Sequence, residues 1–265
     1  MSAAAASPAN STLDQSGALG RLRDFARAVR SVESLSDLRV LMGEAVTSFG
    51  VEYFLMTHHV DFGKPAPSSV QMSNYPAEFV ALQRERGGWR DDPVLLACER
   101  TSVGFFWSDI ANFIPLSAHH QRRFAGGRRF GLSDGFVVPN HIPGEYSGSV
   151  HFTVHGEKQF PRDLASAFQS LAAYGFEAAR QLVRKKGDGL IPRAPLTDRQ
   201  VDCLLLAARG KSDTDIAALL GIKSCTVNEH IEGAKRRYCV ATRQQAIILA
   251  LFNSEITYAE ILQQR

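Results

Sequence analysis

The sequence predicts an α+β fold, with an N-terminal α-β-α sandwich on an antiparallel sheet and a C-terminal all-α domain of four helices. Three observations predict it. The 265 residues suffice for two modest domains, and their 45% hydrophobic and 22% charged residues are ordinary for a folded protein. Helical and alternating apolar patterns are mixed before residue 184, whereas only helical patterns follow residue 195. Between them, cations, two glycines and two prolines interrupt the periodicity.

The domain boundaries follow from these changes in composition. Residues 1–18 hold little to bury and predict a disordered tail. Residues 19–184 then form the first domain, residues 185–195 the linker and residues 196–265 the second domain. No cationic segment leads into an apolar run, and no uncharged apolar stretch is long enough to span a membrane. We therefore expect a cytoplasmic protein without a membrane partner.

The first domain mixes helices and strands. Its helices are expected at residues 19–32, 35–49, 76–86, 93–100 and 161–183. Its strands are expected at residues 53–60, 69–73, 135–140 and 147–155, the last two around a turn at residues 143–145. The last helix is long and amphipathic, with Asp163 in its first turn. A small antiparallel sheet covered by helices commonly holds a pocket.

The second domain consists of short helices, each with a polar residue at its start. These helices are expected at residues 197–209, 212–220, 224–238 and 242–253. The expected capping residues are Thr197, Ser212, Ser224 and Thr242. Gly210 and Gly221 follow the first two helices, where a left-handed residue ends a helix. Residues 254–265 are interpreted as a further helix to which the sequence assigns no purpose.

The second and third of these helices have the spacing of a helix-turn-helix. Their apolar side chains converge on one core at Ile216, Leu220, Ile222, Val227 and Ile231. Ala217 is small where the helices cross, and Gly221 lies in the turn between them. In this motif the second helix enters the DNA major groove, where small polar residues reach base edges and cations contact phosphates. The candidate DNA-binding residues are Lys211, Lys223, Ser224, Thr226, Asn228, Glu229, Glu232, Lys235, Arg236 and Arg237.

The charge distribution agrees with a double-stranded DNA partner. The net charge of the chain is only +3, but Lys and Arg outnumber Asp and Glu in residues 184–243. A four-helix bundle with a glycine turn and a cationic helix end that complements the helix dipole explains the same residues without DNA.

Residues 196–246 resemble the LuxR-type helix-turn-helix domain. The resemblance rests on the segments LTDRQ, GKSDTDIA and TVNEH and on the following RQQA, which recur in that order and spacing in the family. Two positions depart from the family pattern: Gln200 replaces a glutamate and Tyr238 replaces a leucine. Glutamine keeps the size and hydrogen bonding of glutamate without its charge, so the bundle is expected to form with one ion pair weakened. The resemblance implies a transcriptional regulator.

The upstream domain shows no pattern of a phosphorylated receiver domain. Instead, the stretch from NYPAEF to GFFWSD resembles the autoinducer-binding domain of quorum-sensing regulators. The matching positions are Pro76, Asp92, Pro93, Val94, Phe106, Trp107, Gly131, Gly135 and the strand ending near Thr153. The resemblance implies a small-molecule signal, an N-acyl-homoserine lactone or a related amide. In that family an aspartate accepts the ligand amide N–H, a tryptophan donates to the lactone carbonyl and a tyrosine contacts the acyl carbonyl.

Two positions of the ligand pattern differ in this chain. Phe79 stands at the tryptophan position and cannot donate a hydrogen bond, and Gln83 stands at the tyrosine position. The lactone carbonyl would then need a donor from Trp89, from Gln83 or from a water. The candidate ligand-binding residues are Asp92, Phe79, Gln83, Trp107, Tyr75, Trp89, Phe106 and Thr153. Relatives altered at the same two positions include regulators that answer non-standard or plant-derived signals, which is an alternative.

Each of these residues also has a purely structural interpretation. Asp92 followed by proline is typical of a helix N-cap, and the aromatic residues would fill the core of any sandwich. The cysteines at 98, 203, 225 and 239 and the adjacent histidine pairs at 58–59 and 119–120 lack metal-ligand spacing. Arg122, Arg123, Arg128 and Arg129 are interpreted as a solvated helix face. We therefore expect no metal and no cofactor.

The expected function is that of a ligand-responsive transcription factor that binds a palindromic promoter site as a homodimer, with RNA polymerase as a further candidate partner. The dimer surfaces are expected on the helices at residues 161–183 and 242–253. A ligand-independent partner that inhibits a related regulator is the alternative. No G-x-S-x-G, H-E-x-x-H or glycine-rich phosphate loop occurs, so an enzyme is not expected.

Overall fold

The structure is a computed structural model that describes residues 15–61, 66, 69–86, 89–185 and 195–263. Contacts divide the chain into two compact units. The first contains the chain up to Asn140 together with Gly148–Lys185, and the second contains His141–Ser147 and Lys186–Arg265. Most of the expected tail and linker, residues 1–14 and 186–194, lies outside the described residues.

A five-stranded antiparallel sheet forms the centre of the first unit. The strands are β1 (Tyr53–His58), β2 (Gln71–Ser73), β3 (Phe105–Phe106), β4 (Leu132–Asn140) and β5 (Gly148–His155). They lie in the order β2-β1-β5-β4-β3. Met56 of β1 pairs with Val150 of β5 and, on the other side, with Met72 of β2. The α+β sandwich with an antiparallel sheet is therefore confirmed.

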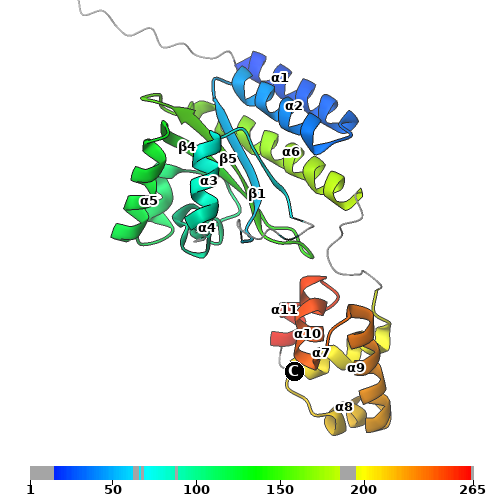
Figure 1. Cartoon of the computed structure of the whole chain (residues 1–265). Coiled ribbons are helices and arrows are strands. Elements are labelled where there is room, and N and C mark those ends of the chain that lie inside the picture. The colour runs from blue at the N-terminus through cyan, green and yellow to red at the C-terminus, as the bar shows by residue number, and fades with distance from the viewer. Residues whose placement is uncertain (1–14, 62–65, 67–68, 87–88, 186–194, 264–265) are drawn as a thin grey trace, which may run out of the picture. The chain divides into compact units, whose positions relative to one another are not determined.

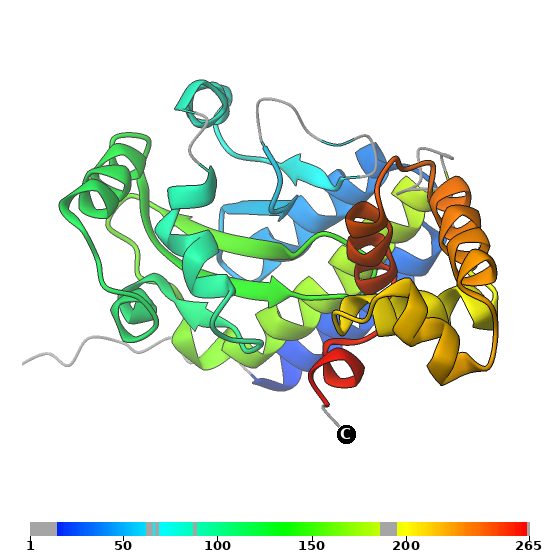
Figure 2. The same cartoon turned by 90° about the horizontal axis from the view of Figure 1, so that it is seen from below.

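One face of the sheet carries α1 (Gln15–Ala28), α2 (Leu35–Ser48) and α6 (Ala165–Lys185), with the short η1 (Val29–Ser31) and η4 (Arg162–Leu164) at their ends (Figure 1 and Figure 2). The largest core cluster lies here. Gly175 of α6 permits the close packing, because a Cβ at this position would lie 2.7 Å from the sulfur of Met42 and 3.1 Å from the methyl of Met56.

The opposite face carries α3 (Ala77–Arg86), α4 (Pro93–Cys98) and α5 (Ala118–Arg128), together with η2 (Trp89–Asp91) and η3 (Trp107–Asn112) (Figure 1). A smaller apolar cluster packs this layer, and it includes Val94, Phe105 and Ile110. Because α3 contributes little to that cluster, this face leaves room between the helices and the sheet.

Three local features differ from the sequence prediction. The first helix begins at Gln15 instead of Leu19, so the expected tail ends earlier, and Ala18 is buried in the core. The strand β3 was not predicted, and the helix α5 was expected only through the helix face assigned to its arginines, without bounds. β3 has only two residues, and α5 contains two glycines and no clear apolar stripe. Ser117 and His120 form a capping box that starts α5 nonetheless.

The second unit contains α7 (Asp198–Ala208), α8 (Asp213–Leu220), α9 (Ser224–Tyr238), α10 (Arg243–Phe252) and the short α11 (Tyr258–Leu262). Thr197, Ser212 and Thr242 each form a capping box, as their positions predict. The prediction that Ser224 caps α9 is wrong: the N-cap is Lys223, and its side chain makes no capping hydrogen bond. Only two residues separate Gly221 from the helix, so Ser224 already has helical geometry.

The two departures from the family pattern have direct structural roles. The Gln200 side-chain oxygen accepts from the Thr197 backbone N–H at 3.1 Å, which completes the capping box that a glutamate would form. Tyr238 is among the largest fully buried side chains, and its hydroxyl donates to Glu255 at 3.0 Å. The tyrosine therefore connects the core to the C-terminal extension.

Candidate functional site

A cavity of about 490 Å³ lies between the sheet and the layer of α3, α4 and α5. This volume is in the range of small-molecule sites. Its lining includes residues from α2, α3, α4, η3 and α5 as well as from four strands. Five of the predicted ligand-binding residues lie together in this lining: Tyr75, Phe79, Gln83, Asp92 and Trp107.

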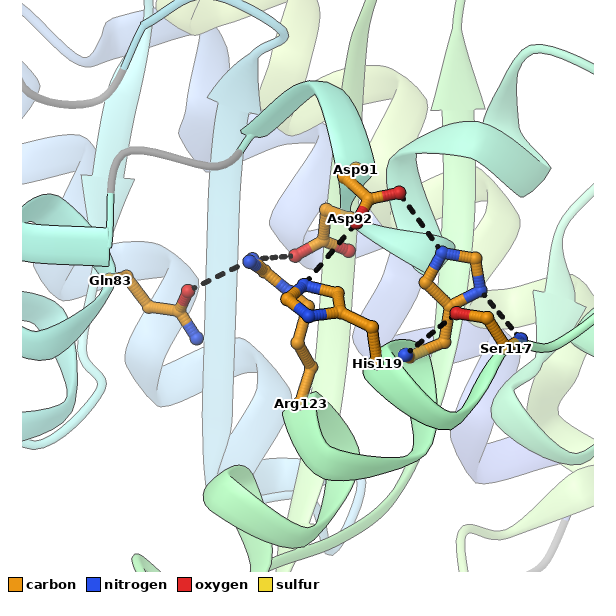
Figure 3. A network of polar contacts seen from close by, with 7 residues as sticks. Gln83, Asp91, Asp92, Ser117, His119 and Arg123 are labelled. Atoms are coloured by element: carbon orange, nitrogen blue, oxygen red, sulfur yellow. Dashed lines mark hydrogen bonds and ion pairs between the residues drawn. The ribbon is translucent and has the colours of Figure 1, made fainter.

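Asp92 occupies the polar end of the cavity and makes two contacts. One carboxylate oxygen accepts from the Val94 backbone N–H at 2.9 Å, so Asp92 is the N-cap of α4, followed by Pro93 at the first helical position. The other oxygen pairs with the Arg123 guanidinium at 2.7 Å (Figure 3). The carboxylate therefore caps a helix and also faces the cavity beside a cation.

Arg123 reaches from α5 into the space between α3 and α4 (Figure 3). Its Nη2 also donates to the Gln83 side-chain oxygen at 3.3 Å. The side chain of Arg123 is only 10% exposed. The interpretation of Arg122, Arg123, Arg128 and Arg129 as one solvated face is therefore wrong for Arg123, whereas the other three are exposed.

The neighbouring Asp91 connects the same two segments at the surface. Its carboxylate lies 3.3 Å from His119 Nε2 and 3.2 Å from His120 Nε2 (Figure 3). Nδ1 of His120 accepts from the Ser117 backbone N–H within the capping box of α5. Two adjacent aspartates thus hold the segment before α4 to α5, and only Asp92 lines the cavity.

Phe79 and Tyr75 form an aromatic wall of the cavity. The Phe79 ring contacts the rings of Tyr75 and Phe130 edge-on, with centroids 5.4 Å and 5.5 Å away. The Tyr75 hydroxyl shares a hydrogen bond of 2.7 Å with Thr153. Burial raises the pKa of the Tyr75 phenol, so the hydroxyl stays neutral. Thr153 is buried behind Tyr75 and positions it without lining the cavity itself.

Trp107 lines the cavity, and its indole N–H has no acceptor among the described residues. Gly135 makes room for this ring, because a Cβ there would lie 2.9 Å from the indole. Phe106, the preceding residue, points to the opposite face of the sheet, where its ring packs against Phe136 and Phe160. The backbone of Trp89 begins η2, and its side chain lies outside the described residues.

His151 of β5 is a lining residue that the sequence analysis did not single out. It is 6% exposed, and its Nε2 lies 2.8 Å from the Ser149 hydroxyl, which in turn lies 2.9 Å from His59 Nε2. Burial lowers the pKa of His151 to about 4, against a partial opposing effect of Asp92. The imidazole is therefore neutral at physiological pH.

This low pKa predicts acid sensitivity of the first unit. The pKa of His151 is about 4 in the folded state and 6.5 in an unfolded chain, so below pH 6.5 the unfolded state binds more protons. The unfolding free energy should fall by about 3 kcal/mol as pH falls from 7 to 4 through this residue alone. Both tryptophans belong to this unit, so tryptophan fluorescence in urea measures it.

The matched variant is His151→Gln, which keeps a polar group near Ser149 and cannot titrate. Between pH 7 and pH 4, the loss of unfolding free energy should be smaller in this variant than in the wild type, by about 3 kcal/mol. The other histidines contribute equally to both proteins. Identical acid dependence of the two proteins would contradict the assignment to His151.

The second candidate surface is the outer side of α9. Val227, Ile231, Ala234 and Tyr238 are buried in the core, which turns the opposite side of the helix outward. Gly221 adopts φ 65° and ψ 35° between α8 and α9, a left-handed conformation that favours glycine. The predicted residues exposed on or before α9 are Lys223, Ser224, Asn228, Glu229 and Arg236. Lys211 is exposed before α8.

The other predicted residues of this surface are partly engaged within the unit. Lys235 is 18% exposed in its side chain and pairs with Glu232 at 2.7 Å. Arg237 donates to the Pro195 backbone carbonyl at the start of the unit. Thr226 is half-buried. Cys225, to which the sequence assigned no chemistry, is exposed near the start of α9. Lys223, Lys211 and Arg236 are therefore the cations most available for a phosphate.

Neither a metal site nor a membrane span is found in the described part of the chain. No group of three His, Cys, Asp or Glu side chains there could hold a metal ion. None of the described helices is both long and apolar enough to cross a membrane.

Family profiles match both units. The profile described as autoinducer binding domain matches residues 34–179. The profile described as bacterial regulatory proteins, luxR family, matches residues 194–250. Together they account for most of the described chain.

Individual proteins give the same result. The chain is 29% identical to the transcriptional activator protein BjaR1 of Bradyrhizobium diazoefficiens, over 86% of this chain and 93% of that protein. It is 25% identical to the transcriptional activator protein AhyR of Aeromonas hydrophila, over 86% and 88%. The fold is similar to that of Escherichia coli SdiA in a crystal structure, with a TM-score of 0.69 at 19% identity over 89% of this chain and 98% of that one.

Proposed function

The chain belongs to the LuxR family of bacterial transcriptional regulators and carries the autoinducer-binding domain of that family, and from this premise we propose that it is a ligand-responsive regulator that binds a promoter as a homodimer. Members of the family bind DNA and small signals, and they are not enzymes. The proposed signal is a small amphiphile with an amide, of which the N-acyl-homoserine lactones are the reference case. We place the protein in the cytoplasm.

The observation that carries this proposal is the cavity in the first unit. It combines apolar lining residues, including Val80, Leu95 and Phe124, with a polar cluster at Asp92, Arg123 and Gln83. An acyl chain fits the former, and an amide N–H can bond to the carboxylate. A ligand buried there stabilises the fold that binds it, in proportion to its concentration over its dissociation constant. The signal can therefore control how much active protein is present.

The direct experiment is mass spectrometry of small molecules extracted from purified full-length protein, together with its melting temperature before and after their removal. A bound amphiphile and a lower melting temperature after removal support a ligand-responsive regulator. Promoter binding that is unchanged by removal of all small molecules would favour the ligand-independent inhibitory partner.

On the proposed DNA surface, different residues contact the bases and the phosphates. One helix reads only a few base pairs, so a palindromic site and a two-fold dimer are expected. The dimer surfaces proposed are the helices α6 and α10, and Ile248 of α10 is 62% exposed. RNA polymerase is proposed as a partner at the promoter.

Two substitutions test this division. Lys223→Ala removes a phosphate contact, so it should weaken binding to specific and random DNA alike and lower the salt-dependence slope by about 1. Asn228→Ala removes a side chain that can pair with adenine, so it should cost about 1–3 kcal/mol on the preferred site only.

The measurement is a salt titration of binding to the preferred site and to random duplex. Arg199→Ala is the matched control, because Arg199 lies on α7 and pairs with Asp202 at 3.5 Å. An Asn228→Ala protein that loses as much affinity for random duplex as for the preferred site would contradict the division.

A further inference from the structure

The cavity as a whole is lined by more cations than anions. Its lining includes three arginines, Arg39, Arg84 and Arg123, and one carboxylate, Asp92. Arg39 and Arg84 are exposed and lie toward solvent, whereas the Arg123 side chain is 10% exposed. His151 also lines the cavity, but its imidazole is neutral and leaves the charge of the lining unchanged.

Arg123 has hydrogen-bond donors to spare. A guanidinium has five N–H groups. The two contacts recorded for Arg123, to Asp92 and to Gln83, both come from Nη2. Neither Nε nor Nη1 has an acceptor among the described residues. These two nitrogens are not among the buried polar atoms that lack a partner, so they remain accessible and can donate to an acceptor that enters the cavity.

Asp92 retains capacity for a ligand donor. An ionised carboxylate has about four acceptor positions. The backbone N–H of Val94 and the guanidinium of Arg123 occupy two of them. An amide N–H can therefore bond to Asp92 while the neighbouring Arg123 receives an acceptor from the same molecule.

The donors and charges in the lining indicate which kind of ligand group would bond to Arg123. Phe79 is 8% exposed, packs against Tyr75 and Phe130, and offers no donor, so the neutral donors left in the lining for a lactone carbonyl include the Trp107 indole N–H. Asp92 balances the charge of Arg123, but Arg39 and Arg84 add positive charge to the lining that a neutral ester carbonyl would not compensate. Both hydrogens of Nη2 are donated to Asp92 and Gln83, so a ligand carboxylate would accept a charge-assisted bond from Nε or Nη1, roughly twice as strong as a neutral bond. The carboxylate therefore fits this end better.

We propose that the cavity selects an N-acyl amino acid with a free carboxylate, in preference to the corresponding lactone. The amide N–H bonds to Asp92, the carboxylate to Arg123, and the acyl chain lies along the apolar interior. This inference rests on the proposed function, since it specifies the ligand of the same cavity.

The experiment compares matched ligands that differ only in the ring. N-hexanoyl-, N-octanoyl- and N-dodecanoyl-homoserine lactone are each titrated into the full-length protein beside the ring-opened N-acyl-homoserine. Slightly acidic buffer keeps the lactones closed and the acids ionised. Isothermal titration calorimetry should show about tenfold tighter binding of the acid for the best chain length.

Variants of α5 assign the preference to one side chain. Arg123→Gln should bind acid and lactone equally, whereas Arg122→Gln, an exposed neighbour, should keep the wild-type ratio. Arg123→Lys keeps the charge but loses the separate Nε and Nη1 donors, and should give an intermediate ratio. These ratios compare two ligands on one protein, so they do not depend on its stability, and the wild-type ratio remains decisive if a variant fails to fold.

The outcomes separate the two proposals. Equal or tighter binding of the lactone to the wild type overturns the carboxylate inference and leaves the proposed function intact. Failure of all six compounds to bind, with no small molecule co-purifying, overturns both. An acid preference that survives in Arg123→Gln overturns the assignment to Arg123.

Discussion

Replacement of Asp92 by alanine is expected to lower the unfolding free energy of the first unit by about 4 kcal/mol. The largest part, about 3 kcal/mol, comes from leaving the Arg123 guanidinium without its partner at a site where its side chain is only 10% exposed. Loss of the hydrogen bond that caps α4 adds about 1 kcal/mol. Tryptophan fluorescence in a thermal scan should show a melting temperature lower by about 10 °C.

Two aspartate-to-asparagine variants separate the causes. Asp92→Asn keeps a good capping residue and removes the charge, so it should lose about 2–3 kcal/mol. Asp91→Asn is the matched control, because Asp91 also contacts α5 but its side chain is 60% exposed, and it should lose less than about 1 kcal/mol. Similar losses for both asparagine variants would show that Asp92 acts only as a surface charge.

The helices of the C-terminal unit could be predicted because their signals are local. Thr197, Ser212 and Thr242 start their helices with capping boxes that span only three residues of sequence. Gly210 and Gly221 have positive φ where the first two helices end. Such features depend only on nearby residues. The N-cap of α9 depends instead on the backbone path after Gly221, which places Lys223 rather than Ser224 at the cap.

The polar end of the cavity could be predicted only in part. Asp92 was identified from its sequence motif, and both interpretations of it, cap and cavity residue, correspond to contacts in the structure. Arg123 could not be identified, because its partner lies 31 positions away and four arginines within one short stretch are typical of an exposed face. The packing of α5 against α4 decides which of them turns inward. His151 was missed because the alternating pattern of β5 predicts which face of the sheet a side chain lies on, but does not predict that a cavity adjoins that face.

The C-terminal extension is a second case in which distant contacts determine the role. Sequence alone left residues 254–265 without a purpose. In the structure Ile256 is 1% exposed within the core of the second unit. Glu255 accepts from the Tyr238 hydroxyl at 3.0 Å and from the Leu196 backbone N–H at 2.8 Å. The extension thus joins the end of α9 to the segment that begins the unit.

Deletion of residues 255–265 from the full-length chain is therefore expected to unfold the second unit. Removal of Ile256 costs about 2–3 kcal/mol of apolar burial, and each of the two donors left without Glu255 costs about 1–3 kcal/mol. The sum of about 5 kcal/mol is comparable with the whole stability of a domain of this size. Far-UV circular dichroism should lose helical signal, and DNA binding should disappear.

Deletion of residues 258–265 is the matched control for this truncation. It removes α11, whose Tyr258 and Leu262 are 70% and 75% exposed, and leaves Glu255 and Ile256 in place. It does remove the contact of the Arg209 guanidinium with the Glu260 backbone carbonyl, an exposed bond worth about 1 kcal/mol. The shorter deletion should therefore retain a folded second unit that binds DNA. Tryptophan fluorescence, which reports the first unit, should be unchanged in both; equal DNA binding by the two truncated proteins would show that Glu255 and Ile256 do not hold the unit together.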